Sequence, residues 1–186
     1  MSGPPAWAFE KPHVAAPDPS WTARGVTLCA RLAEVLRPWL VDGVEHVGST
    51  SVPGLAAKPV VDVMASVRDV DVVVASAGAV LAAGGWVYVP PSLDVASPWR
   101  RFFVLPDATG ERRAAHLHVL PADHPRWHAQ LTFRDALRAD PALAAEYGLL
   151  KRRLTTETTD REAYTAGKTA FVTRVLARRE VVLPTE

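Results

Sequence analysis

Hydrophobic residues in the first third of the chain follow first a helical and then a strand-like spacing. Apolar residues recur at helical spacing between Trp21 and about Leu36, which predicts a helix with Ser20 as its N-cap. Residues 44–48 form a short strand candidate, and the β-branched run 58–67 is the clearest strand pattern in the chain. A turn rich in Ser, Pro and Gly would join these two strands.

The rest of the chain contains shorter apolar segments and then becomes helical. Residues 70–83 have a strand-like first half, but their Ala-rich remainder and the Gly84–Gly85 stop favour a helix. Further strands are predicted at 86–90, 97–106 and 114–121. Three amphipathic helices are predicted at 124–140, 141–157 and 160–180. This order of elements indicates an α+β or mixed α/β fold with a helical C-terminal segment.

Length and composition are typical of a single globular domain with no strong charge. We expect residues 1–20, rich in Pro, Ala and Asp, to form an extended arm and residues 21–180 to form one domain. The formal net charge of +1 offers no global field for nucleic acid, so recognition by charge must be local. The N-terminus lacks a signal-peptide pattern and the apolar runs are shorter than a membrane span, which favours a cytoplasmic protein with no membrane partner.

A hydroxyl-rich turn follows the first predicted strand. Gly48, Ser49, Thr50 and Ser51 lead into a short helical segment, and Lys58 follows a few residues later. Hydroxyl groups and free backbone N–H groups at such a point can bind an anion. A simple helix cap with nothing bound explains the same residues, and the bare motif favours that explanation. The pattern is not a P-loop, because the Gly-Lys-Ser/Thr element is missing.

Asp62 stands inside a hydrophobic strand, where an isolated carboxylate is costly. A metal ion, a cationic side chain or the edge of a cleft would compensate for it, and so would a structural pair with Arg100 or Arg101. His116 and His118 are two residues apart on a later strand and therefore share one face. Two imidazoles on one face suit a metal or phosphate site, or are simply polar residues near a strand edge.

Two motifs in the predicted C-terminal helices have less specific interpretations. Tyr164 and Lys168 are four residues apart on one helix face, which we interpret as a face closing over a cleft. The chain lacks the glycine fingerprint that would accompany this spacing in a dinucleotide-binding dehydrogenase. The basic run Lys151–Arg153 is interpreted as a solvated helix face.

Several longer motifs resemble the GrpB family. The segments DPSW, EHVGSTSVPGLAAKPVVDV, RRFFV, HLHV, FRDALRADPALAAEYGLLKRRL and REAYTAGKTAFV stand in the order seen in that family. The resemblance runs from about Asp18 to Val175. It implies an α/β fold similar to the nucleotidyltransferase superfamily, with a mixed sheet flanked by helices and a helical C-terminal segment. Members of that superfamily carry a Gly-Ser turn followed by strand carboxylates that hold two metal ions.

The resemblance implies a role for each candidate residue. Gly48 and Ser49 match the Gly-Ser turn that holds nucleotide phosphates, and Asp62 matches the first metal carboxylate. The second carboxylate position is Met64, and a third looks replaced by His116 or His118. Ordinary two-metal transfer with Mg²⁺ is therefore in doubt, because one Asp and two His suit a softer divalent ion better.

The functional hypothesis is a metal-dependent enzyme that binds ATP or another nucleoside triphosphate. It would transfer a nucleotidyl or phosphoryl group to a small-molecule acceptor, or drive an ATP-dependent ligation. The expected catalytic residues are Asp62, His116 and His118, with Asp62 and His118 holding a divalent metal, Mg or Mn. The expected phosphate- and nucleotide-binding residues are Gly48, Ser49, Thr50, Ser51, Lys58, Arg101 and Lys168. Arg101 is preferred to Arg100 because adjacent strand residues face opposite sides.

Two other functions remain open. A catalytically degenerate module that senses a nucleotide or another phosphorylated metabolite is the main alternative, and the missing second carboxylate favours it. The third hypothesis is a nucleic-acid-binding protein. The near-neutral charge and the lack of interleaved aromatic and basic residues argue against it. We therefore expect a small-molecule partner and no nucleic acid, whereas the acceptor, the base and the oligomeric state stay open.

Overall fold

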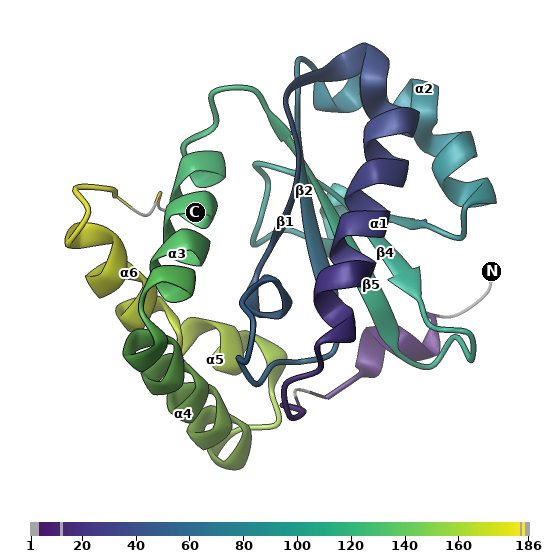
Figure 1. The fold of residues 1–186 in the computed structure, drawn as a ribbon. Coiled ribbons are helices and arrows are strands. Elements are labelled where there is room, and N and C mark those ends of the chain that lie inside the picture. The colour runs from purple at the N-terminus through teal and green to yellow at the C-terminus, as the bar shows by residue number, and fades with distance from the viewer. Residues whose placement is uncertain (1–3, 12, 183, 185–186) are drawn as a thin grey trace.

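A computed structural model describes residues 4–11, 13–182 and 184. In this described part of the chain, five strands form one mixed sheet in the order β1-β2-β5-β4-β3 (Figure 1). The strands are β1 (Leu40–Val47), β2 (Val61–Val67), β3 (Val87–Val89), β4 (Arg101–Pro106) and β5 (Arg113–Pro121). The central pair β2–β5 is parallel, whereas β1–β2, β4–β5 and β3–β4 are antiparallel. The sequence-based expectation of a mixed sheet flanked by helices is confirmed.

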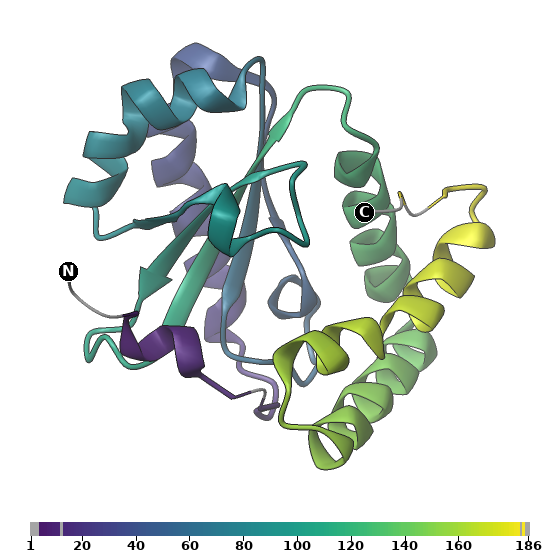
Figure 2. The ribbon, with the colours of Figure 1, turned by 180° about the vertical axis from the view of Figure 1, so that it is seen from behind.

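The helices α1 (Ser20–Leu36) and α2 (Val70–Ala83) cover one face of this sheet, as both ribbon views show (Figures 1 and 2). In β2 and β5, every second residue faces these two helices and packs against their apolar stripes. This layer forms the main core. The core includes Leu32, Leu36, Val61, Val63, Ala65, Val67, Val73, Ala77, Leu81, Phe103, Leu117 and Val119. The opposite alternation places Asp62, Met64, His116 and His118 on the other face.

The C-terminal helices form a second layer on the side of the sheet that carries Asp62. They are α3 (Pro125–Ala139), α4 (Pro141–Glu157), α5 (Arg161–Ala166) and α6 (Thr169–Ala177). These helices have their own core around Phe133, Tyr147 and Phe171, and the loop residues Val52 and Leu55 are embedded in it. On the sheet, Val47, Met64 and Leu120 pack against Trp127 and Leu131 of α3. The loop after β1 therefore joins the sheet to the helical layer.

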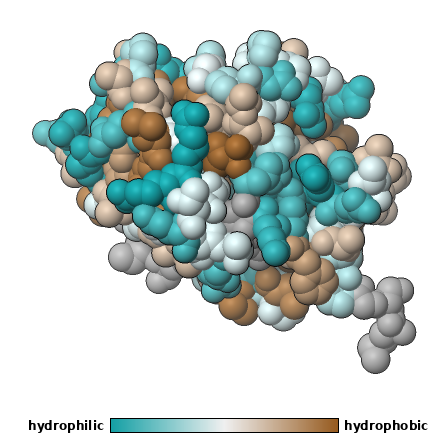
Figure 3. Space-filling view, turned by 90° about the horizontal axis from the view of Figure 1, so that it is seen from below, coloured by the Kyte–Doolittle hydropathy of each residue, from teal (hydrophilic) through white to brown (hydrophobic). Residues whose placement is uncertain are grey.

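Short 3₁₀ turns complete the chain: η1 (Ala6–Phe9), η2 (Arg37–Trp39), η3 (Ser49–Ser51) and η4 (Pro91–Leu93). The described part of the N-terminal arm packs on the sheet through the buried Trp7, which contacts Phe102 and Val104. Further along the arm, Ala15 and Ala57 form an isolated antiparallel bridge. On the molecular face seen from below, hydrophilic residues surround small, separated hydrophobic areas (Figure 3). Among the described helices, we find none long and apolar enough to cross a membrane.

Several details differ from the sequence-based expectation, among them the strand expected at 97–106, which begins only at Arg101. The last predicted helix is broken into α5 and α6 at Gly167 and Lys168. Gly167 lies so close to α4 that a Cβ atom there would be 2.5 Å from Leu154 Cδ2. At the other end of the domain, Ser20 is the first residue of α1 and not its cap. Pro19 is at the N-cap position, and the Ser20 N–H donates to the Asp18 side chain at 2.8 Å.

Gly25 of α1 allows the helix to lie directly against the ring of His46 at the end of β1. A Cβ atom at Gly25 would lie 2.0 Å from His46 Nδ1. The His46 ring, only 9% exposed, is in turn hydrogen-bonded through Nε2 to Thr50 Oγ1 at 3.0 Å. The close approach of α1 therefore holds the turn that follows β1.

We expect Gly25→Ala to lower the free energy of unfolding by about 1–3 kcal/mol, because the added methyl group overpacks the His46 site. Gly78→Ala is the matched control, since no heavy atom lies within 4 Å of a Cβ there. Replacing Gly by Ala inside helix α2 should stabilise the protein by up to about 1 kcal/mol. Urea unfolding of both variants measures the difference, and equal stability of the two would contradict the packing argument.

Candidate functional site

The parallel pairing of β2 and β5 brings Asp62, His116 and His118 together. Asp62 is directly opposite His116, and Met64 is opposite His118. Asp62 Oδ1 accepts a hydrogen bond from His116 Nδ1 at 2.8 Å and lies 3.5 Å from His118 Nε2. Each of the three residues offers one possible ligand atom, and these three atoms lie within 4.8 Å of one another. The sheet register alone thus assembles one carboxylate and two imidazoles.

Electrostatics keep this cluster as a carboxylate beside neutral imidazoles. Burial raises the pKa of Asp62, but the hydrogen bonds with His116 and His118 outweigh it, so the pKa lies well below its usual range. Burial lowers the pKa of His116, and Asp62 only partly offsets this effect. Burial and the neighbouring charge of Arg100 lower the pKa of His118 to about 4. At neutral pH the site therefore carries one negative charge from these three groups.

The hydrogen-bond partners determine the tautomer of each histidine. Because His116 Nδ1 donates to the Asp62 carboxylate, its Nε2 carries a lone pair. That Nε2 atom is buried and has no hydrogen-bond partner among the described residues. Arg100 can only donate, so His118 Nδ1 accepts from it and Nε2 carries the hydrogen. His116 thus offers a free ligand atom, whereas His118 could ligate through Nε2 only after Arg100 is released.

The expectation that Arg101, and not Arg100, reaches the site is wrong. Arg101 begins β4, and its guanidinium binds Asp71 at the start of α2, with Nε 2.7 Å from Asp71 Oδ1. Arg100 lies just before the strand, so strand alternation does not govern its direction. Its Nε and Nη2 atoms each donate to Asp94 at 2.8 Å, and its guanidinium also contacts His118 and the ring of Phe102.

The Gly48 backbone lies against the Asp62 carboxylate. Gly48 follows Val47, the antiparallel partner of Asp62, and has a φ of 69°, a conformation that disfavours residues with a side chain. A Cβ atom at Gly48 would lie 2.5 Å from Asp62 Oδ2. The turn and the carboxylate are therefore neighbours, and only glycine permits this approach.

The hydroxyl groups of the turn have different surroundings. Thr50 and Ser51 are each 2% exposed, and their hydroxyls donate to Val60 O at 3.0 Å and to Gly48 O at 2.6 Å. These bonds stabilise the turn itself, so the two side chains do not face a ligand. The Ser51 N–H also donates to Gly48 O, at 3.2 Å, whereas phosphate binding by the Thr50 N–H stays a prediction. Ser49 contacts the hydroxyl of Tyr147, a residue of α4.

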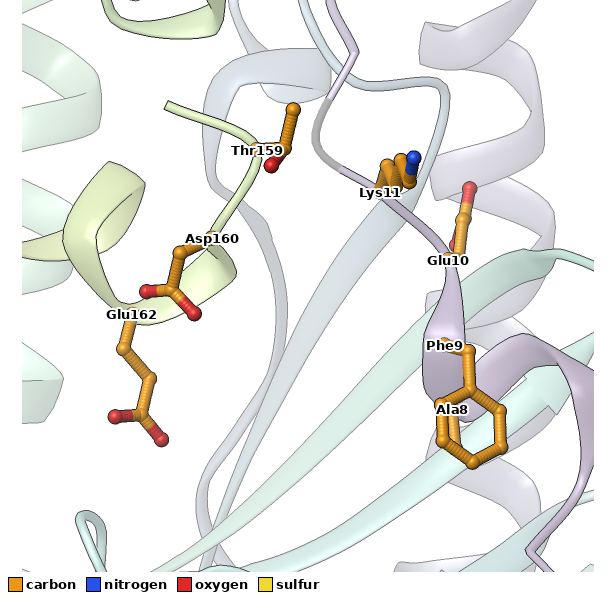
Figure 4. A pocket seen from close by; sticks show the side chains of 7 residues that line it. All are labelled: Ala8, Phe9, Glu10, Lys11, Thr159, Asp160 and Glu162. Carbon is orange, nitrogen blue, oxygen red and sulfur yellow. The ribbon is translucent and has the colours of Figure 1, made fainter. Parts of the chain in front are cut away.

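The predicted phosphate-binding lysines lie around this cluster. Lys58 Nζ is 2.9 Å from Glu10 Oε2, and its charge lowers the pKa of His116. Lys168 lies with its Nζ 4.5 Å from the centre of the Tyr164 ring and within electrostatic range of Asp62. Glu10 also lines a pocket between the N-terminal arm and the start of α5, together with Lys11, Asp160 and Glu162 (Figure 4).

Tyr147 and Lys151 are part of this region although the sequence did not single them out for it. Lys151 is 1% exposed, so the expectation of a solvated Lys151–Arg153 face is wrong for this residue, whereas Arg152 and Arg153 are exposed. Tyr147 and Lys151 have the same spacing of four residues as Tyr164 and Lys168. That repetition was the available signal, but only Tyr147 and Lys151 share a helix face: the expectation of one face for Tyr164 and Lys168 is wrong, because α5 ends at Ala166 and Lys168 precedes α6.

Comparison with known proteins identifies the family. The GrpB protein family model matches residues 11–178. The chain belongs to the GrpB family. A UPF0157 protein of Deinococcus radiodurans is 42% identical over 134 residues, which are 72% of this chain and 65% of that protein. This GrpB chain thus spans less than two thirds of that curated relative's length. A protein of Mycolicibacterium paratuberculosis named dephospho-CoA kinase is 33% identical over 156 residues, 73% of this chain and 38% of that protein.

Solved structures agree with this assignment to the GrpB family. The crystal structure of conserved protein GrpB from Enterococcus faecalis has a TM-score of 0.73 and 28% identity, covering 91% of this chain and 96% of that one. The RNA terminal uridylyl transferase Cid1 has a TM-score of 0.50 and 14% identity, covering 74% and 42% of the two chains. The second likeness extends to the fold alone and confirms the expected nucleotidyltransferase-like architecture.

We expect Lys151 to make the stability of the protein rise with pH. Burial, together with the charges of Lys168 and Arg152, lowers its pKa from 10.5 to about 7, and Tyr147 packs beside it. Between these two values the unfolded chain binds more protons than the folded protein, so raising the pH through this window favours folding. Below pH 7 the lysine is charged in both states and this gain is lost.

Thermal melting from pH 7 to pH 9 checks this expectation with the Lys151→Met variant. Its melting temperature should change less with pH than that of the wild type, while Lys168, whose pKa is about 8, still contributes a slope in both. Arg153→Met, which removes an exposed charge from the same helix, should follow the wild type. Parallel curves for Lys151→Met and the wild type would contradict the assignment.

Proposed function

We propose that this protein binds a nucleoside triphosphate, ATP being the first candidate, and transfers a nucleotidyl or phosphoryl group to a small acceptor. The observation that carries the proposal is the contact of the Gly48 turn with Asp62, which itself faces two histidines on the parallel strand. A turn with backbone N–H groups beside a carboxylate cluster is suited to a phosphate–metal complex. The nucleotidyltransferase-like fold supports the same function.

The residues present fit a single divalent ion. Asp62, His116 and His118 offer ligand atoms within 4.8 Å of one another, and the buried His116 Nε2 has no other partner among the described residues. One carboxylate and two imidazoles favour an ion such as Mn²⁺ over Mg²⁺. When bound, such an ion would polarise a phosphoryl oxygen and neutralise negative charge.

The side chains around this cluster have separate tasks in the proposed reaction. The acceptor oxygen attacks a phosphorus atom of the triphosphate, and pyrophosphate leaves in a nucleotidyl transfer or the nucleoside diphosphate in a phosphoryl transfer. Backbone N–H groups of the Gly48–Ser49 turn would orient the phosphates. Arg100, held by Asp94 and stacked on Phe102, keeps a positive charge at the His118 end of the site.

One relative supports a phosphorylated small molecule over a nucleic acid. The Mycolicibacterium protein that aligns with this chain is named for phosphoryl transfer to dephospho-CoA. The formal net charge of +1 likewise provides no broad attraction for a polynucleotide. An acceptor or ligand of the size of a metabolite is therefore the simpler expectation.

A binding module without turnover is the second candidate function. Met64 occupies the position where a second metal carboxylate would stand, and it is 2% exposed and packed with Val47 and Leu120. A pair of metal ions therefore lacks a second carboxylate ligand from β2. An assay for release of pyrophosphate or ADP from ATP distinguishes the two candidate functions, since only an enzyme would release either product.

Asp62→Asn should abolish manganese-dependent binding of ATP and leave the fold intact. The amide keeps an oxygen that accepts the hydrogen bond from His116, but it removes the negative charge that a metal requires. Isothermal titration with ATP, with and without Mn²⁺, and thermal melting in EDTA measure the two effects. A loss of roughly 3–5 kcal/mol in stability without metal would instead make Asp62 a structural residue.

Arg100 and Arg101 provide a matched pair of neighbouring charges. Arg100→Ala should weaken metal-free binding of ATP about tenfold, because it removes a partly buried cation beside His118. Arg101→Ala should leave the affinity unchanged, since its guanidinium binds Asp71 on the other side of the sheet. Titration of both variants measures the difference, and a larger effect at Arg101 would contradict this placement of the site.

A further inference from the structure

Two tyrosine–lysine pairs, one on α4 and one spanning the junction of α5 and α6, lie near each other, and Tyr147 of the first pair contacts Ser49. Lys151 Nζ is 4.8 Å from the centre of the Tyr147 ring, and Lys168 Nζ is 4.5 Å from that of Tyr164. Helices α4 and α5 are neighbours in both ribbon views (Figures 1 and 2). The lysines are close enough for the charge of Lys168 to lower the pKa of Lys151, and the two tyrosines also interact.

Neither lysine forms an ion pair with an acidic side chain of the described residues, although the more distant Asp62 interacts electrostatically with Lys168. Over residues 4–11, 13–182 and 184, no carboxylate oxygen lies within 4.0 Å of either ammonium nitrogen. Lys151 donates one hydrogen bond, to the Ala56 carbonyl, and Lys168 has no hydrogen-bond acceptor in the same part of the chain. Buried or half-buried cations are normally paired, because an ammonium group loses its hydration on burial. Two adjacent lysines without a counter-ion therefore point to an anionic ligand.

The position of these lysines relates them to the proposed nucleotide site. Tyr147 links the two features, since its hydroxyl contacts Ser49 and its ring packs under Lys151. Lys168 is also within electrostatic range of Asp62 and Lys58. An anion at Lys168 would therefore lie within electrostatic range of both the Asp62 cluster and Lys151.

We propose that Lys168, with Lys151 behind it, forms a separate subsite for the distal phosphate of a polyphosphate whose other end lies at the Gly48–Ser49 turn. The half-buried Lys168 contacts the phosphate directly. The fully buried Lys151, anchored on Ala56, adds positive charge in its protonated form, which a bound phosphate would favour. This inference rests on the proposed function, and it restricts the ligand to molecules with at least two linked phosphates.

A phosphate fits these surroundings better than a single carboxylate. It carries more charge than a carboxylate and several acceptor oxygens, so that one group can interact with both the ammonium of Lys168 and the field of Lys151. A nucleoside triphosphate and a free polyphosphate share this chemistry. Comparing ATP, AMP and pyrophosphate distinguishes between them.

The test is titration calorimetry in EDTA with pyrophosphate, ATP and AMP as separate probes. The wild type should bind pyrophosphate and should bind ATP more tightly than AMP. Lys168→Met should lose at least about tenfold in affinity for pyrophosphate and ATP, with AMP unaffected. Lys151→Met should lose less, and Arg153→Met, which removes an exposed charge paired with Glu157, should match the wild type.

The outcomes also separate this subsite from the proposed reaction. Asp62→Asn should retain metal-free pyrophosphate binding, because it removes a negative charge near Lys168, while it loses the manganese-dependent binding of ATP. Equal pyrophosphate affinity of Lys168→Met and the wild type would overturn the subsite, and so would equal binding of ATP and AMP by the wild type. If the wild type bound pyrophosphate more tightly than ATP, the subsite would be assigned to free polyphosphates. The idea that a nucleotide supplies the bound phosphate would then be overturned.

Discussion

The carboxylate of Asp62, inside the central strand β2, is the constraint on which the arrangement around it depends. A carboxylate in this position must be compensated locally, and the parallel partner β5 does so with His116 and His118. The antiparallel partner β1 contributes by ending at a glycine whose missing side chain makes room for Asp62 Oδ2. Both neighbours of β2 are therefore adapted to one acidic side chain.

The surrounding layers hold this cluster in place from two sides. On the far face, α1 and α2 bury the alternate residues of β2 and β5, which fixes the register that pairs Asp62 with His116. Near the site, α1 also supports the turn after β1 through Gly25, His46 and Thr50. The C-terminal helical layer closes the other side and supplies Lys151 and Lys168, neither of which forms an ion pair with an acidic side chain in the described part of the chain. Positive charge is thus concentrated beside a single carboxylate although the whole chain is almost neutral.

Most residues of the site were predictable from local sequence, but the directions in which their side chains point were not. Asp62, His116 and His118 could be selected because strand alternation places polar residues on one face, and Gly48 because a turn must follow the strand. Arg100 and Arg101 could not be told apart, since the choice depends on where β4 begins and on the position of Asp71 at the start of α2. Thr50 and Ser51 matched an anion-binding pattern, yet their hydroxyls are used within the turn because the chain folds back onto Val60 and Gly48.

The sequence by itself determined the order of helices and strands, the division between an apolar and a polar face of β2 and β5, and the membership in the GrpB family. These properties depend on periodicity and on contiguous motifs, which are local. Only the tertiary structure decided that Lys151 is buried while Arg152 and Arg153 are exposed, and that it meets Lys168 beside the turn. The physical reason is that burial and charge proximity depend on which helix packs against which strand, and residues far apart in the chain establish those contacts.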